Sequence, residues 1–296
     1  MRAFRDEIAQ RFQAVQDHIC AFVDKENEQS FREDNWTYAT GEGGGRTRVY
    51  EGGTLLEKGG VNFSAITGLS LPASAATAFR IPDGTPFHAT GVSLVLHPRN
   101  PHVPTIHLNI RYFEAGDLYW FGGGVDLTPY YPEQNQVSGF HRSLKSFCAG
   151  LGRDYPAYKR ACDEYFFNKH RNEARGVGGL FFDHLRGPKN EELHFVEGLG
   201  RLFPDLYQPF VAARDKRFSE AQRQFQLHRR SRYAEFNLVY DRGTLFGLQS
   251  GGNTESILMS LPPLCRWVYD FQPEPGSPEE KLTEYFLKPR DWTEDA

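Results

Sequence analysis

Two stretches decide the fold: Val92-Ser93-Leu94-Val95-Leu96-His97 and Ile106-His107-Leu108-Asn109-Ile110-Arg111-Tyr112-Phe113. In both, an apolar residue recurs at every second position, which is typical of a strand that covers a core with one face. A proline-rich turn separates the two, so we expect them to pair. Pairing would place five polar side chains together on the opposite face: Ser93, His97, His107, Asn109 and Arg111.

Strands and helices extend in both directions from this pair. We expect strands separated by turns from Trp36 to Asp126, the last a short one over 118–121 that three glycines end. Apolar residues at three- and four-residue spacing then predict helices over 4–23, 140–151, 157–175, 193–202 and 206–226. Strands are expected again over 233–240 and 244–249, joined by a turn at Asp241-Arg242-Gly243. A capping box at Ser277 opens a last helix through Leu287.

Strands grouped first, helices next and strands again predict an α+β fold with a large, mostly antiparallel sheet. No repeat and no long linker interrupts the chain, so we expect one domain over residues 1–296.

Composition excludes several classes of protein. The 34 basic and 38 acidic residues give a net charge of −4, too balanced for a protein dedicated to binding nucleic acid. No apolar run is long enough for an integral membrane segment. The four cysteines are scattered, which fits a reducing compartment. A cytoplasmic location is therefore predicted.

The five polar side chains on the strand pair have two interpretations. Solvent-facing sheet surfaces commonly carry such residues, so a wet face is one of them. However, Lys and Glu, which are common on solvent faces, do not occur on this one. That composition favours a binding surface.

A second candidate lies in Trp120-Phe121-Gly122-Gly123-Gly124-Val125-Asp126. Three glycines allow the backbone to approach another group closely. Asp126 follows them among aromatic residues, where a carboxylate is partly desolvated and either paired or chemically tuned. The simpler interpretation is a turn residue that makes local hydrogen bonds.

Two further groups of residues allow weaker hypotheses. Four histidines are candidate metal ligands, although structural or substrate-binding roles are the more common ones: His97, His107, His141 and His170. A run of arginines from Arg214 to Arg232 is either a solvated helix face or a set of partners for ligand carboxylates. RNA binding through this run is the third interpretation.

At these residues the chain resembles the oxygen-dependent coproporphyrinogen III oxidases of heme biosynthesis. The matching blocks follow the family's order over nearly the whole chain: 43–46, 60–64, 91–113, 120–131, 169–183, 232–249 and 255–263. The resemblance implies a sheet of about seven strands with helices on both sides, a homodimer, no organic cofactor and O2 as co-substrate. A divalent metal is left open.

The implied reaction converts two propionates of a porphyrinogen into vinyl groups and gives protoporphyrinogen IX. The chemistry of this reaction and the resemblance together suggest three catalytic residues. Asp126 would bind the pyrrole nitrogens or take an N–H proton, as the resemblance also implies, and His107 matches the family's proton donor. Arg111 would hold a propionate or stabilise developing negative charge. The resemblance places the substrate against Ser93, Asn109, Ile110, Arg111, Gly251, Gly252 and Asn253.

One position departs from the family pattern. Asn253 stands where relatives usually carry an arginine, so Arg232, Arg242 or Arg266 is expected to compensate. Two alternatives to this enzyme remain: a non-catalytic tetrapyrrole-binding protein and an oxidoreductase dependent on a histidine-bound metal.

Overall fold

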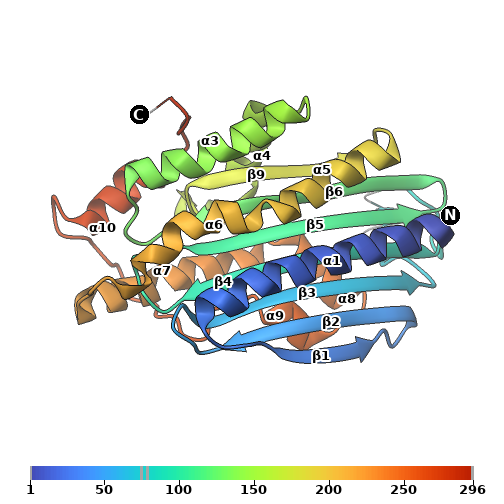
Figure 1. The fold of residues 1–296 in the computed structure, drawn as a ribbon, viewed down its shortest axis with the longest axis horizontal. Helices are drawn as coiled ribbons and strands as arrows, with labels where there is room; N and C mark the ends of the chain where they lie inside the picture. The colour runs from blue at the N-terminus through green and yellow to red at the C-terminus, as the bar shows by residue number, and fades with distance from the viewer. Residues whose placement is uncertain (1, 74–75, 78–79, 295–296) are drawn as a thin grey trace.

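A seven-stranded sheet forms the centre of the computed structural model, which describes residues 2–73, 76–77 and 80–294 (Figure 1). Its strands run in the order β1-β2-β3-β4-β5-β6-β9, and each pairs antiparallel with its neighbour. Their bounds are β1 Arg32–Thr37, β2 Gly41–Glu51, β3 Leu56–Gly68, β4 Phe87–Pro98, β5 Thr105–Ala115, β6 Leu118–Thr128 and β9 Gly178–Leu185. The predicted α+β class and antiparallel sheet are confirmed.

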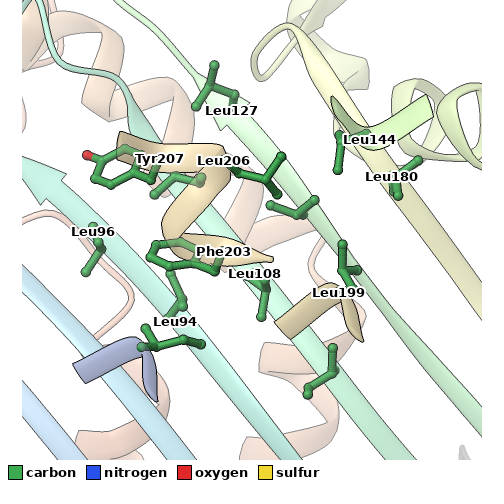
Figure 2. Close-up of a cluster of buried hydrophobic side chains, with 14 of the residues drawn as sticks. Leu94, Leu96, Leu108, Leu127, Leu144, Leu180, Leu199, Phe203, Leu206 and Tyr207 are labelled. Atoms are coloured by element: carbon green, nitrogen blue, oxygen red, sulfur yellow. The ribbon is translucent and has the colours of Figure 1, made fainter. Parts of the chain in front are cut away.

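The predicted strand pair is β4 and β5, with Ser93 directly opposite Asn109 and Val95 opposite His107. The apolar positions of both strands are fully buried under a layer of helices. Figure 2 shows part of this core, in which Leu94 and Leu108 lie below Phe203. The polar positions consequently face the other side of the sheet.

Five helices cover the core side or lie at its edge: α1 Arg2–Asn27, α3 Gln134–Gly150, α4 Tyr155–Tyr165, α5 Lys189–Arg201 and α6 Phe203–Val211. In α1, apolar residues at helical spacing, among them Ile8, Phe12 and Val15, are fully buried. Figure 1 shows α1, α5 and α6 running across one face of the sheet, with α3 and α4 near β9.

The opposite face carries α7 Glu220–Val239, α8 Arg242–Gln249 and α9 Thr254–Leu258, which Figure 1 draws behind the strands. Helices therefore lie on both sides of the sheet, as expected. Short elements complete the described chain: β7 Phe167–Asn168, η1 Lys169–Arg171, β8 Glu173–Ala174, η2 Ala212–Asp215, α10 Pro278–Lys281 and η3 Leu282–Phe286. In the described residues, no helix combines the length and apolar character needed to cross a bilayer.

The strands predicted over 233–240 and 244–249 are wrong, because both segments are helical. A capping box at Ser219 and Gln222 starts α7, which continues to Val239 and buries Tyr233 and Phe236 on one face. The residues from 233 onwards favour strands by composition, but they are helical here because the capped start and the buried face of α7 outweigh that preference. Asp241 caps α8 by accepting a hydrogen bond from the Thr244 N–H, and is not part of a hairpin turn.

Two predicted helices are also too long. The helix expected over 157–175 ends at Tyr165, and the short β7–η1–β8 segment follows. The helix expected over 206–226 is divided by η2 and an extended stretch that precedes Ser219.

The three glycines do not end a strand, as the sequence suggested, but lie inside β6. A Cβ on Gly124 would lie 2.3 Å from the Leu180 carbonyl oxygen, and one on Gly123 would lie 2.4 Å from that of Asn109. Glycine is therefore required here for close packing of the strand backbones.

Candidate active site

A cavity of about 860 Å³ lies between the polar face of the sheet and the helices α8 and α9. Strand side chains form its floor, and four of the predicted site residues on β4 and β5 line it: Ser93, His107, Asn109 and Arg111. The antiparallel register explains this grouping, because Ser93 and Asn109 are direct neighbours and alternate residues of β5 share one face.

His107 is held by a buried carboxylate. Its Nδ1 lies 2.8 Å from Oδ1 of Asp126, which is opposite it on β6. Asp126 is 1% exposed and is not one of the residues that line the cavity. The structure therefore presents His107 to the cavity, with Asp126 behind it.

Asp126 also forms an ion pair with Arg175, whose Nη2 lies 2.7 Å from both carboxylate oxygens. Burial alone would raise the pKa of Asp126, but the charge of Arg175 and the hydrogen bond of His107 lower it below its usual value. Asp126 is thus an ionised carboxylate that fixes the orientation of the His107 ring.

Arg175 was missed by the sequence analysis, which placed it inside a helix. Its guanidinium lies over the rings of Phe166, Tyr233 and Phe236, at 4.1, 4.6 and 4.8 Å from their centroids. Nη1 donates to Oδ1 of Asn237 at 3.0 Å. Burial lowers the pKa of Arg175, but the attraction of Asp126 outweighs it, so the pKa is raised. This side chain is therefore a fixed cation in the cavity wall.

Asp241 is a second missed residue, because its place before Gly243 suggested a turn. It lines the cavity, and its Oδ2 accepts bonds from the Thr244 N–H and hydroxyl, both at 2.8 Å. The Tyr165 hydroxyl donates to Oδ1 at 2.9 Å. Burial raises the pKa of Asp241, but these hydrogen bonds outweigh it and lower the pKa. A carboxylate that accepts three hydrogen bonds is thus held beside the cavity.

Two arginines lie at the cavity around one carboxylate. Nη2 of Arg111 lies 3.1 Å from Oδ1 of Asp183, and Nη2 of Arg242 lies 3.5 Å from Oδ2. All three residues line the cavity. Arg242 is the member that is open to solvent, with a side chain 60% exposed.

The walls of the cavity are largely aromatic. Tyr165 stacks on Phe181 with ring centroids 4.1 Å apart, and Phe113 stacks on Trp120 at 5.1 Å. Phe246 of α8 adds a further ring. Apolar walls with a few fixed charges suit a large apolar ligand that carries carboxylates.

The remaining substrate-contact predictions differ in outcome. The Ile110 side chain is fully buried in the core on the opposite face of β5, so only its backbone is near the cavity floor. Gly252 and Asn253 line the cavity, whereas Gly251 does not. Asn253 caps α9 by accepting a hydrogen bond from the Ser256 N–H.

The four histidines proposed as metal ligands do not converge. His97 contacts Thr105 and the Ser260 carbonyl, and His141 contacts Tyr155 and the Val177 carbonyl, so both rings bind within the protein. His170 binds Glu235 and Tyr240 outside the cavity. Over residues 2–73, 76–77 and 80–294, no three His, Cys, Asp or Glu side chains are grouped so that they could hold a metal ion.

The arginine run is mostly bound within the protein. Arg223 and Arg230 both bind Glu57, and Arg229 binds Glu173. Of the three arginines expected to compensate for Asn253, only Arg242 lines the cavity; Arg232 binds Glu235, and Arg266 binds Gln224.

Comparisons with known proteins identify the family of this chain. The family model described as coproporphyrinogen III oxidase matches residues 7–292. A protein of Dictyostelium discoideum named oxygen-dependent coproporphyrinogen-III oxidase is 50% identical over 313 aligned residues, which cover 97% of this chain and 94% of that protein. The chain therefore belongs to the coproporphyrinogen III oxidase family.

Proposed function

We propose that this chain converts two propionates of coproporphyrinogen III into vinyl groups in the cavity under α8, with O2 as the oxidant and protoporphyrinogen IX as the product. The observation that supports this most directly is an aromatic cavity that contains His107, held by a buried carboxylate, together with arginines. A porphyrinogen is an apolar macrocycle with four carboxylates, so aromatic walls and a few cations match its chemistry.

Electron balance fixes what O2 must do. When a propionate becomes a vinyl group it loses CO2, one hydrogen of the ring-bound carbon and two electrons. Those electrons and two protons reduce O2 to hydrogen peroxide. The substrate hydrogen provides one of these protons, so one more must be supplied for each vinyl group formed. Oxygen first bonds to a pyrrole carbon as a hydroperoxide, which then removes the hydrogen while the carboxylate leaves as CO2. The protein therefore has to make the pyrrole electron-rich and to deliver a proton.

We assign the proton to His107 and the binding of pyrrole N–H groups to Asp241. With Nδ1 bound to Asp126, the Nε2 atom of His107 has no protein partner among the described residues, and the ring lines the cavity. Asp241 presents an ionised carboxylate to the same cavity. Asp126, expected from the sequence to contact the pyrrole, acts through His107 and Arg175 instead. Arg111 holds a propionate, and Ser93 and Asn109 both contact the macrocycle.

The Asp126→Asn variant tests the positioning role. Asparagine keeps the shape but removes the charge that orients His107 and balances Arg175, so we expect kcat to fall roughly 100-fold or more. Steady-state turnover of coproporphyrinogen III measures the effect. Unchanged turnover would show that Asp126 does not position a catalytic group.

The activity itself is tested by aerobic and anaerobic incubation of purified protein with coproporphyrinogen III. We expect divinyl product, CO2 and peroxide only in the presence of O2. A tetrapyrrole carrier would bind the substrate and form no product. The same assay on protein dialysed against a strong chelator tests the metal-dependent alternative, which requires activity to disappear and to return with a divalent metal.

Four further expectations belong to this proposal. The enzyme uses no organic cofactor, it works as a homodimer in the cytoplasm, and it binds no nucleic acid. Sedimentation velocity tests the dimer, and the absorption spectrum of protein purified without added cofactor tests for a bound chromophore.

A further inference from the structure

Asp183 occupies an unusual position for an acidic residue in a cavity expected to bind carboxylates. Its side chain is 15% exposed, and it lies between Arg111 of β5 and Arg242 at the start of α8. Those guanidinium groups are the cations that a substrate propionate would also bind. A protein carboxylate therefore competes with the ligand for the same arginines.

The backbone around Asp183 is shaped to place it there. Phe121 pairs with Leu185 and Gly123 with Phe182, so β9 contains one extra residue opposite β6 at Asp183 and His184. His184 has a φ of 56°, in the left-handed region, and its N–H donates to Oδ1 of Asp183 at 3.1 Å. Such bulges redirect a side chain.

The neighbouring strand leaves space for the same group. A Cβ on Gly122 would lie 2.8 Å from Oδ1 of Asp183 and 2.9 Å from Nε of Arg111. Glycine at this position of β6 thus admits the ion pair between β5 and β9. The bulge in β9 and the glycine in β6 both favour the same ion pair between Asp183 and Arg111.

Charge at this part of the cavity is therefore limited. Among these three residues, Arg111 and Arg242 contribute two positive charges and Asp183 one negative charge, which leaves one positive charge for a ligand carboxylate. The carboxylate of Asp241 also lines the cavity, but it is bound by Thr244 and Tyr165 and is assigned above to the pyrrole N–H groups. The arginine at the back of the cavity, Arg175, is already neutralised by Asp126.

We propose that Asp183 is a specificity residue that restricts Arg111 and Arg242 to a single substrate carboxylate. It allows one propionate to bind and disfavours a tetrapyrrole with a second acidic group beside that propionate. This inference rests on the proposed function, because it takes the cavity to be the porphyrinogen site.

The test compares two aromatic porphyrins that bind without turnover. Coproporphyrin III has four carboxylates, and uroporphyrin III has an acetate in place of the methyl group beside each propionate. We expect the wild-type protein to bind coproporphyrin more tightly. In Asp183→Asn, which frees the second positive charge, the preference should fall at least fivefold, mainly through tighter uroporphyrin binding.

Matched variants separate this role from a structural one. Asp117→Asn, at an exposed turn, removes the same charge elsewhere and should leave the preference unchanged. In the double variant Asp183→Asn with Arg242→Gln, the net charge returns to one, and the preference should return towards that of wild type. If Asp183→Asn alone is unstable, the double variant can still be compared with wild type.

An unchanged preference in Asp183→Asn, an equal loss of affinity for both porphyrins, or no recovery in the double variant would overturn the proposal. Aerobic turnover of wild type from the same preparation keeps this outcome distinct from a failure of the proposed function. If wild type makes no divinyl product, the function is wrong, and porphyrin preference is then no longer evidence about a substrate.

Discussion

Asp126 and Arg175 are both buried charges, and neither would be stable there alone. An unpaired ion in a protein interior costs several kcal/mol, whereas this pair has two short contacts and further hydrogen bonds to His107 and Asn237. The arrangement leaves the His107 ring with one fixed nitrogen and one that faces the cavity. Electrostatics at these residues thus orient the ring that we propose as the proton donor.

His107→Gln tests that group directly. Glutamine can still hydrogen-bond to Asp126 but cannot exchange a proton, so we expect kcat to fall by roughly 10²–10⁴ while substrate affinity changes little. Steady-state kinetics and porphyrin binding measure the two effects. His18→Gln is the control, because His18 is exposed on α1. A kcat within twofold of wild type would show that His107 handles no proton in the slow step.

Glu235 predicts a pH dependence of stability. It binds His170 and Arg171 of η1, and Trp267 donates to it as well. Burial raises its pKa, but these partners and Arg232 outweigh it and lower the pKa to about 2. Because the folded-state pKa is depressed, the stabilisation is present above the unfolded pKa of about 4.3 and is lost as pH falls towards about 2.

Glu235→Gln should therefore lower the free energy of unfolding at pH 7 by about 1–2 kcal/mol, after allowance for solvent screening. The difference from wild type should shrink at pH 3.5. Urea unfolding at both pH values measures it, and Glu42→Gln, an exposed residue of β2, is the control. An equal difference at both pH values would contradict the ion-pair account.

At the scale of elements, β6 depends on glycine and α3 does not. The backbone of β9 lies so close to Gly124 that an added methyl group would overlap it, whereas a Cβ on Gly139 of α3 meets nothing within 4 Å. The same substitution should therefore have opposite effects at the two positions.

Gly124→Ala should destabilise the protein by about 1–3 kcal/mol or more and reduce activity, because β6 and β9 must separate. Gly139→Ala should stabilise it by up to about 1 kcal/mol, because alanine has the higher helix propensity. Thermal unfolding and turnover of both variants measure these effects. A neutral or stabilising effect of Gly124→Ala would show that the strand packing around β6 is looser than described.

For the whole molecule, substrate attraction depends on the charges near the cavity and not on the net charge of the protein. The net charge of −4 repels a tetracarboxylate, yet Arg111 and Arg242 lie at the cavity. Attraction at an exposed group such as Arg242 is screened by salt, because the Debye length falls from about 10 Å at 0.1 M to about 3 Å at 1 M.

Raising NaCl from about 0.05 to about 0.5 M should therefore raise the KM for coproporphyrinogen III several-fold and leave kcat nearly constant. Kinetics at matched pH test this, with sucrose of equal osmolality as the control. A KM that does not change with salt would mean that the exposed arginine makes no ionic contact with the substrate.

By itself the sequence determined the pairing of β4 with β5, the polar face of this pair and the grouping of Ser93, His107, Asn109 and Arg111, because strand alternation is a local property. No such pattern predicted the edge strand β9. Tertiary structure decided the rest. Helix packing made 233–239 helical against its strand-like composition, and it brought Arg175 and Asp241 to the cavity from distant parts of the chain. No local pattern specifies such contacts, because they depend on which faces of different elements are buried together.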